Sequence, residues 1–277
     1  MKANVIKIFA LFFISFGLIF TACDEELIDD VPIGENDYTA AENNAASEEM
    51  VFGVFENVNN YGISEEGISG TKNLTEECVN VYWASGYDYN SGEFPTEYPD
   101  TLILDFADCP DQSGIIKVVY DAELSYFTVN VTASVILADY VDDGVTMNGT
   151  LGLTLTKELM DNAGPELEIV TDTINFTEGS SAWWWKGTRT VAWSEGFATI
   201  NDGSDDVFLI GGSSEGVDED GTTFTSNITD DIVFAVACDY PKDGTVSVTI
   251  NDGEIVSDFG FNETGEDLGE CDAFYQI

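Results

Sequence analysis

From Cys78 to the end of the chain, apolar and polar residues alternate in short segments that are separated by Gly, Asp and Asn. This alternation is typical of β-strands that have one buried face. Turn sequences such as 142–144 and 251–253 stand between neighbouring segments and favour hairpins between consecutive strands. We therefore predict an all-β protein of about a dozen antiparallel strands, arranged as a rolled sheet, a sandwich or a barrel.

One segment before the strands has a helical period instead. From Thr39 to about Asn59, apolar residues recur three and four positions apart, and Gly62 follows: Ala46, Met50, Val51, Val54, Phe55 and Val58. We predict an amphipathic helix that packs on the sheet. A helix that lies on a membrane is the alternative, but its polar face is acidic rather than basic, which argues against membrane contact.

The first residues have the pattern of an export signal. Lys2 and Lys7 precede an uncharged stretch at 8–20, which is shorter than the roughly 20 apolar residues that span a bilayer. Phe20-Thr21-Ala22-Cys23 resembles the bacterial lipobox, and the resemblance implies cleavage before Cys23 and a lipid on its thiol. An ordinary secretory signal with an incidental cysteine is the alternative.

The residues after Cys23 predict where the lipid holds the protein. Asp24-Glu25-Glu26 and Asp29-Asp30 resemble the surface-export signals of Bacteroidota-type lipoproteins, which implies an outer-membrane protein that faces the cell exterior. The inner leaflet is the alternative location. We expect a signal peptide at 1–22, an acidic tether at 23–37 and one β-rich domain with an N-terminal helix at 38–277.

Charge and residue usage exclude several functions. After Cys23 there are six basic and 53 acidic residues, a formal charge of about −47, so nucleic acid is not an expected partner. Histidine is absent, which removes His-based catalytic sets and His-ligated metals. A hydrolase that uses two carboxylates remains as an alternative, but no motif selects a pair. We expect no catalytic activity.

Four cysteines remain after Cys23, and in an exported chain they indicate disulfides. Three pairings are possible. Cys78 precedes one strand-like segment and Cys109 follows the next, so a hairpin would bring them together, and Cys238 and Cys271 bracket a second such unit. We predict the pairs Cys78–Cys109 and Cys238–Cys271.

The most distinctive cluster lies in the segment 182–193. If this segment is a strand, the residues Trp183, Trp185, Arg189 and Trp193 share one face, and Arg189 is the only arginine in the sequence. An exposed row of this kind would bind a ligand by stacking on sugar rings or by holding an anionic group. Alternatively, the tryptophans pack in the core and a neighbouring carboxylate pairs with Arg189.

Acidic turns offer oxygen ligands for a hard cation such as calcium. The candidates are Asp202, Asp205, Asp206, Asp218 and Asp220. None of these turns reproduces the twelve-residue calcium loop, so a solvated acidic surface is the alternative to a metal site. No other cofactor is expected.

Several motifs occur in an order that resembles an uncharacterised family of Bacteroidota lipoproteins. They are Leu104-Asp105-Phe106, Cys109, the stretch from Trp185 to Gly196, Cys238, Asp258-Phe259-Gly260 and Cys271. The resemblance implies no particular activity. The first functional hypothesis is therefore a lipid-anchored surface protein with a structural or interaction role, whose partner is a surface glycan or protein. A module that binds a glycan or an apolar ligand beneath the helix is the alternative.

Overall fold

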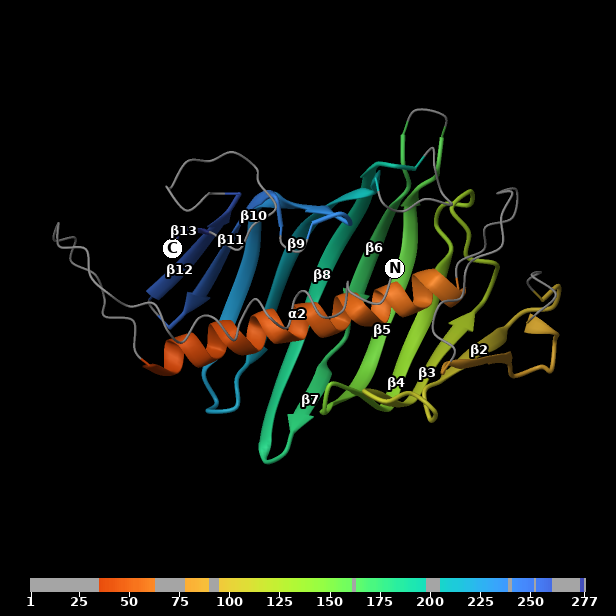
Figure 1. Cartoon of the computed structure of the whole chain (residues 1–277), viewed down its shortest axis with the longest axis horizontal. Helices are drawn as coiled ribbons and strands as arrows, with labels where there is room; N and C mark the ends of the chain where they lie inside the picture. The colour runs from red at the N-terminus through yellow and green to blue at the C-terminus, as the bar shows by residue number, and fades with distance from the viewer. Residues whose placement is uncertain are drawn as a thin grey trace, which may run out of the picture.

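The computed structural model describes residues 35–62, 78–89, 95–160, 163–197, 205–238, 241–251, 253–260 and 275–276. In these residues a single helix lies on one large antiparallel sheet (Figure 1). The helix is α2 (Glu35–Gly62), and the strands are β1 (Asn80–Trp83), β2 (Asp100–Asp105), β3 (Gln112–Tyr120), β4 (Thr132–Asp142), β5 (Val145–Lys157), β6 (Glu166–Thr171), β7 (Ile174–Glu178), β8 (Ser181–Glu195), β9 (Val207–Val217), β10 (Thr223–Ala235), β11 (Asp243–Ile250), β12 (Gly253–Phe259) and β13 (Tyr275–Gln276).

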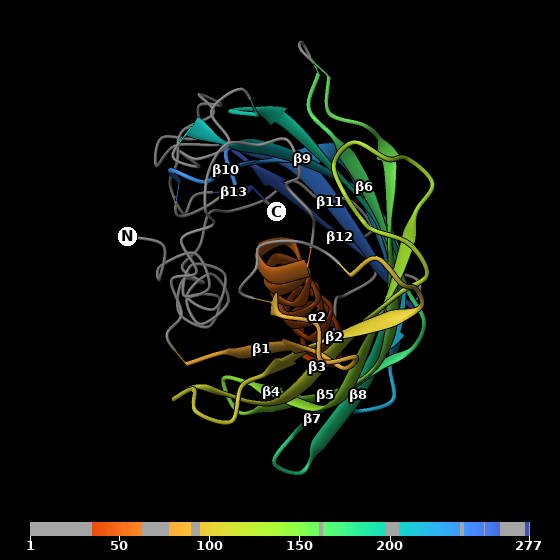
Figure 2. The ribbon, with the colours of Figure 1, turned by 90° about the vertical axis from the view of Figure 1, so that its right-hand side faces the viewer.

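The strands follow one another across the sheet almost in chain order, from β1 at one edge to β13 at the other. The short strands β6 and β7 both pair with the long strands β5 and β8. The sheet curves around α2, which lies in its concavity (Figure 2). The predicted all-β class with one N-terminal helix is confirmed, and the arrangement is the rolled sheet.

Helix α2 runs along the concave face and crosses the strands. It starts at Glu35, inside the segment predicted to be a tether, and it ends at Gly62 as predicted. Val51, Val54 and Val58 from the predicted apolar face are buried, so burial of this face on the sheet holds the helix in place. No helix among the described residues is long and apolar enough to span a membrane.

Tyrosine hydroxyls hold the C-terminal end of α2. The last carbonyls of a helix have no partner within the helix, so they need donors from elsewhere. The hydroxyl of Tyr120 in β3 donates to the carbonyl of Gly62 at 2.6 Å, and that of Tyr89 donates to the carbonyl of Tyr61 at 3.2 Å. Tyr120 is fully buried, and burial raises the pKa of its phenol well above the usual value, so the hydroxyl stays a donor.

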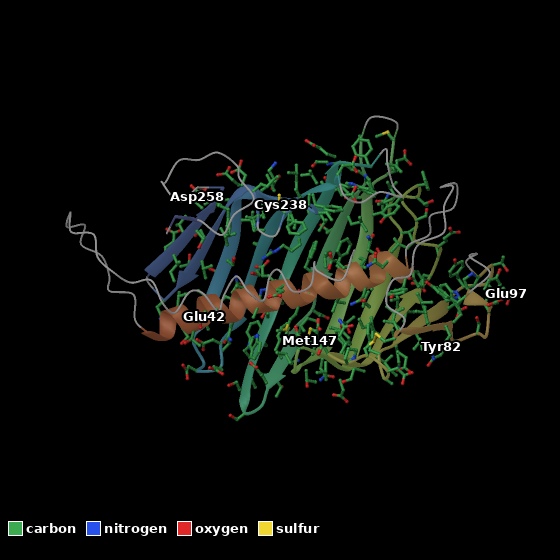
Figure 3. The ribbon with its side chains drawn as sticks, in the orientation of Figure 1. Glu42, Tyr82, Glu97, Met147, Cys238 and Asp258 are labelled. Carbon is green, nitrogen blue, oxygen red and sulfur yellow. A yellow bond between two sulfur atoms is a disulfide. The ribbon has the colours of Figure 1, made fainter. Side chains whose placement is uncertain are left out.

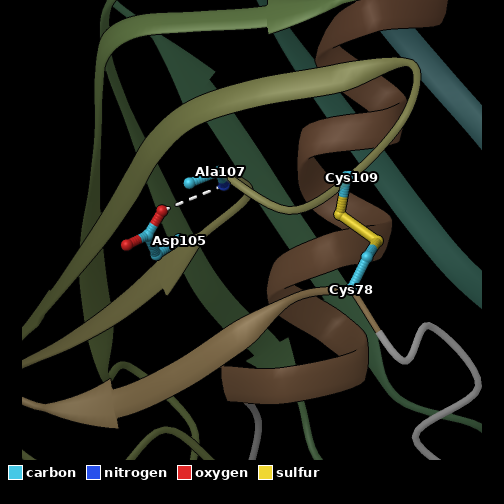
Figure 4. Close-up of a disulfide and its surroundings, with 4 residues drawn as sticks. All are labelled: Cys78, Asp105, Ala107 and Cys109. Carbon is cyan, nitrogen blue, oxygen red and sulfur yellow. Dashed lines mark hydrogen bonds between the residues drawn. A yellow bond between two sulfur atoms is a disulfide. The ribbon is translucent and has the colours of Figure 1, made fainter.

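The first predicted disulfide is present. Cys78 and Cys109 flank the β1–β2 pair, and their Cα atoms are 4.9 Å apart (Figure 4). In the turn that leads to Cys109, the amide of Ala107 donates to the carboxylate of Asp105 at 3.1 Å. Cys238 is buried and disulfide-bonded, but its predicted partner Cys271 lies outside the described residues.

One predicted strand is too long at its start. The alternation from Leu124 predicts a strand at 124–137, but β4 begins only at Thr132. Residues 124–131 form turns in which Asn130 has a φ of 63°. Leu124 and Tyr126 are buried all the same, so the pattern reported burial correctly and extended structure incorrectly.

Candidate functional site

The tryptophan row of β8 faces α2. The burial pattern of this strand alternates, so Trp183, Trp185, Arg189 and Trp193 share one face, as predicted. All four are buried, and Trp185 is 0% exposed. The structure therefore has the core arrangement rather than an exposed row, and no ring of the three tryptophans is free to stack on a sugar.

Polar side chains of α2 accept hydrogen bonds from the indole groups. Trp183 Nε1 donates to Ser47 Oγ at 2.9 Å, and Trp185 Nε1 donates to Asn44 Oδ1 at 3.1 Å. A buried indole N–H needs such a partner, because leaving it without one costs free energy. Ser47 and Asn44 are themselves buried, and these two bonds fix the helix over β8.

Arg189 joins the same helix to the sheet. The residue is 5% exposed, and Nε donates to Glu48 Oε2 at 2.8 Å while Nη2 donates to Glu48 Oε1. Nη2 also donates to Ser214 Oγ in β9 at 3.1 Å. The guanidinium carbon lies 5.5 Å from the ring centroid of Trp185, a cation–π distance. Arg189 is thus paired with a carboxylate and is not free to bind an anion.

Trp193 has a different partner. Its indole Nε1 donates to Asp206 Oδ1 at 3.2 Å, and its ring stacks with Phe208 at a centroid distance of 5.9 Å. Asp206 was one of the candidate calcium ligands, and in the structure its carboxylate accepts a hydrogen bond from an indole N–H.

The other acidic candidates do not form a metal site in the part of the chain that is described. Asp218 Oδ1 accepts from the amide groups of Asp220 at 2.9 Å and Thr222 at 2.7 Å, so it closes its own turn. Asp205 is exposed, and Asp202 lies outside the described residues. No group of three or more metal-ligating side chains occurs among the described residues. Calcium binding stays a prediction.

The space between residues 41–52 of α2 and the sheet contains an apolar cavity of about 160 Å³. Its floor comes from strands β6 and β8 to β12, and Ala41, Ala45, Val51 and Phe52 line it from the helix. The sheet residues are mainly aliphatic: Ile169, Val191, Ile210, Ile228, Ile232, Val246, Val248 and Ile255. Ile210, Ile228 and Val246 are only partly buried, so solvent reaches the cavity.

Acidic residues of α2 line the same cavity. Glu42, labelled in Figure 3, is exposed, Glu48 is bound to Arg189, and Glu49 is partly buried. Burial, with a smaller effect of Asp142 and Asp143, raises the pKa of Glu49 from 4.5 to about 8. The cavity therefore has an apolar floor and a helix wall that bears carboxyl groups.

A second hollow, of about 450 Å³, lies mainly on the opposite face of β8 to β11. Trp185 and Arg189 face the helix, so Lys186 and Thr188 between them face away from it. Hydroxyl and amide side chains dominate its lining: Thr188, Ser213, Thr225, Asn227, Ser247 and Thr249. Its lining residues include no aromatic ring, so it offers no platform for stacking a sugar.

The site residues that pattern reasoning missed are Asn44, Ser47, Glu48 and Ser214. A signal for the first two exists, because both interrupt the apolar face of α2 at a helical spacing. No local signal distinguishes Glu48 from the other acidic residues of the chain.

No family model, curated protein sequence or solved structure matches this chain.

Proposed function

We propose that this protein is a lipid-anchored, non-catalytic binding protein that takes a small apolar group into the cavity between α2 and strands β8 to β12. The observation that carries the proposal is the apolar cavity itself. Of the functions considered from the sequence, binding of an apolar ligand beneath the helix is the one that requires such a cavity. Glycan binding through the β8 tryptophans would require exposed rings, but the rings of these tryptophans are buried.

The volume sets the size of the ligand group. An engineered protein cavity of about 150 Å³ accepts benzene, so the present cavity of about 160 Å³ fits one ring or the end of an acyl chain. Each buried methylene contributes about 0.8 kcal/mol, so a four- to six-carbon end gives roughly 3 to 5 kcal/mol. This corresponds to a dissociation constant near 1 mM for the apolar part alone.

The contacts around the cavity explain why it does not collapse. Moving α2 onto the sheet at this point would disturb the two-bond pair of Arg189 and Glu48 and leave the buried guanidinium poorly paired. Solvent reaches the cavity, so a ligand that fills it displaces water from the aliphatic lining and stabilises the fold.

A carboxylate-based hydrolase is a weaker proposal. Glu48 and Glu49 both line the cavity, but successive residues of an α-helix project about 100° apart around its axis. Glu48 is also held by Arg189. This arrangement does not direct two free carboxylates at one bond.

The proposed location rests on the leader. The lipobox-like Phe20 to Cys23 and the acidic residues that follow support a lipid anchor at the outer membrane, facing the exterior. The Cys78–Cys109 disulfide supports an exported protein, because such bonds persist in oxidising compartments. The anchor would keep the cavity within reach of membrane-derived apolar molecules.

The test is a titration of the full chain, in lipid nanodiscs, with fluorobenzene. Fluorine NMR and the melting temperature report binding. Ala45→Leu fills the cavity from the helix and Val246→Phe fills it from the sheet, whereas Ala46→Leu adds the same side chain at a neighbouring helix position that does not line the cavity. We expect a bound signal and a higher melting temperature for the wild type and Ala46→Leu only. Equal binding by all four proteins would refute the proposal.

A further inference from the structure

We propose that the ligand of this cavity is an amine cation with an apolar tail, whose positive charge lies beside Glu42 and Glu49 while the tail enters the cavity. This inference rests on the proposed function, since it assumes that the cavity binds an apolar group.

The charge balance of the cavity wall carries the inference. Three carboxyl-bearing residues line it, Glu42, Glu48 and Glu49, and Arg189 is the cationic residue that lines it. Arg189 donates to both oxygens of Glu48, and further donors go to Ser214 and to the carbonyl of Thr188. One positive and one negative charge thereby cancel, and two acidic groups remain.

Neither remaining group has a cationic partner within the described part of the chain. The ion pairs there are Lys157–Glu166, Lys186–Glu215 and Arg189–Glu48, and none includes Glu42 or Glu49. Lys242 follows the cavity residue Pro241 in sequence but does not itself line the cavity. A cation in this place would therefore come from the ligand.

A bound cation would offset two effects that disfavour the ionised form of Glu49. Burial takes its carboxyl group away from water, and Asp142 and Asp143 of the β4–β5 turn add negative charge beside it. Both effects disfavour the ionised form and raise its pKa. An ammonium group within about 4 to 6 Å acts in the opposite direction, so binding would ionise Glu49 and form a charge-assisted contact.

The same charges discriminate against a fatty acid. A ligand carboxylate would meet the carboxylate of Glu42 and would offer Glu49 no counter-ion, and the guanidinium that would otherwise pair with it is already bound to Glu48. The formal charge of the whole chain, −45, repels an anion further. The cavity thus selects a cationic amphiphile over a neutral one, and a neutral one over an anionic one.

The experiment compares three six-carbon probes, hexylamine, hexanol and hexanoate, titrated into the full chain at pH 7 and constant ionic strength. Methylamine, which has the charge without the tail, measures the general attraction to an acidic protein. We expect hexylamine to bind at least tenfold more tightly than hexanol, and hexanoate and methylamine to show no binding at millimolar concentration.

Three variants locate the binding site and its charge preference. Glu49→Gln should bring the affinity for hexylamine toward that for hexanol and leave hexanol binding unchanged. Glu56→Gln lies on the same helix away from the cavity lining, and it should retain the tenfold preference. Ala45→Leu should abolish binding of both probes.

The outcomes separate this inference from the proposed function. If hexanol binds and Ala45→Leu blocks it, while hexylamine binds no more tightly or hexanoate binds best, the cavity function stands and the cation inference is wrong. If none of the three six-carbon probes binds, the proposed function fails and the inference fails with it.

Discussion

Glu48 of α2 and Arg189 of β8 form a two-bond ion pair across the interface between the helix and the sheet, 141 residues apart in sequence. The pair is surrounded by the ring of Trp185 and the hydroxyl of Ser214. It fixes both the position of the helix along β8 and the gap that becomes the cavity.

Loss of the carboxylate from this pair should destabilise the protein strongly. Glu48→Ala leaves Arg189 buried without its counter-ion, and we expect the free energy of unfolding to fall by about 3 to 5 kcal/mol. Glu42→Ala removes an exposed glutamate from the same helix and should change it by less than about 0.5 kcal/mol. Urea unfolding measures both variants, and equal losses would show that the ion pair has no special role.

The Cys78–Cys109 disulfide should contribute measurably to stability. The bond closes a loop with a sequence separation of 31 residues, and the chain-entropy model gives roughly 3 to 4 kcal/mol for a loop of that length. Replacing both cysteines with serine should therefore lower the midpoint of urea unfolding. Peptide mapping of the oxidised protein tests the second pair, and a peptide that joins Cys238 to a residue other than Cys271 would contradict the predicted pairing.

Stability should fall as the pH rises from about 5 to 8. Burial raises the pKa of Glu49 to about 8 and that of Glu56 to about 7, both above the ordinary value of 4.5. Between these values the folded protein binds more protons than the unfolded chain, so their stabilising effect is complete below about pH 4.5 and is lost as the pH passes the folded pKa values.

A glutamine at position 49 isolates one of these groups. Glu49→Gln keeps the shape of the side chain and removes the titration, so the variant should gain on the order of 1 kcal/mol over the wild type at pH 8, after allowance for the partial exposure of the site. At pH 5 the two proteins should unfold alike. Parallel pH profiles of the wild type and the variant would exclude Glu49 as the source of the dependence.

The lipid anchor is tested at Cys23. Cys23→Ser removes the thiol that the lipobox-like sequence presents, so metabolic labelling with a tagged fatty acid should mark the wild type alone. Cys78→Ser, which changes a cysteine far from the leader, should be labelled like the wild type. Labelling of the Cys23→Ser protein would refute the anchor, and protease treatment of intact cells separately tests whether the domain faces the exterior.

The features predicted correctly are those that depend on neighbours in sequence. Alternation identifies the face of β8 that carries Trp185 and Arg189, and the hairpin flanked by Cys78 and Cys109 follows from two adjacent strands. The segment at 124–131 failed, because alternation reports burial and not backbone conformation.

The cavity depends instead on contacts between distant parts of the chain. Whether the tryptophans of β8 face water or a covering layer is decided by α2, and nothing near residue 185 encodes which layer covers it. Asn44 and Ser47 resemble ordinary helix polar residues until their partners in β8 are known. Arg189 pairs with Glu48 because of where α2 lies along the sheet. The pattern of apolar and polar residues does not determine that position.

The order of the elements along the chain also has a consequence for biogenesis. From β2 onward, every strand except β7 pairs with the strand made just before it. The sheet can therefore grow by adding hairpins as the chain emerges. Helix α2 is made before all of them, yet the floor of its cavity includes residues of β11 and β12, the last long strands. Its apolar face therefore lacks its full cover until synthesis is nearly complete, and a chain that stalls before Gly253 would leave that face open to chaperones and proteases.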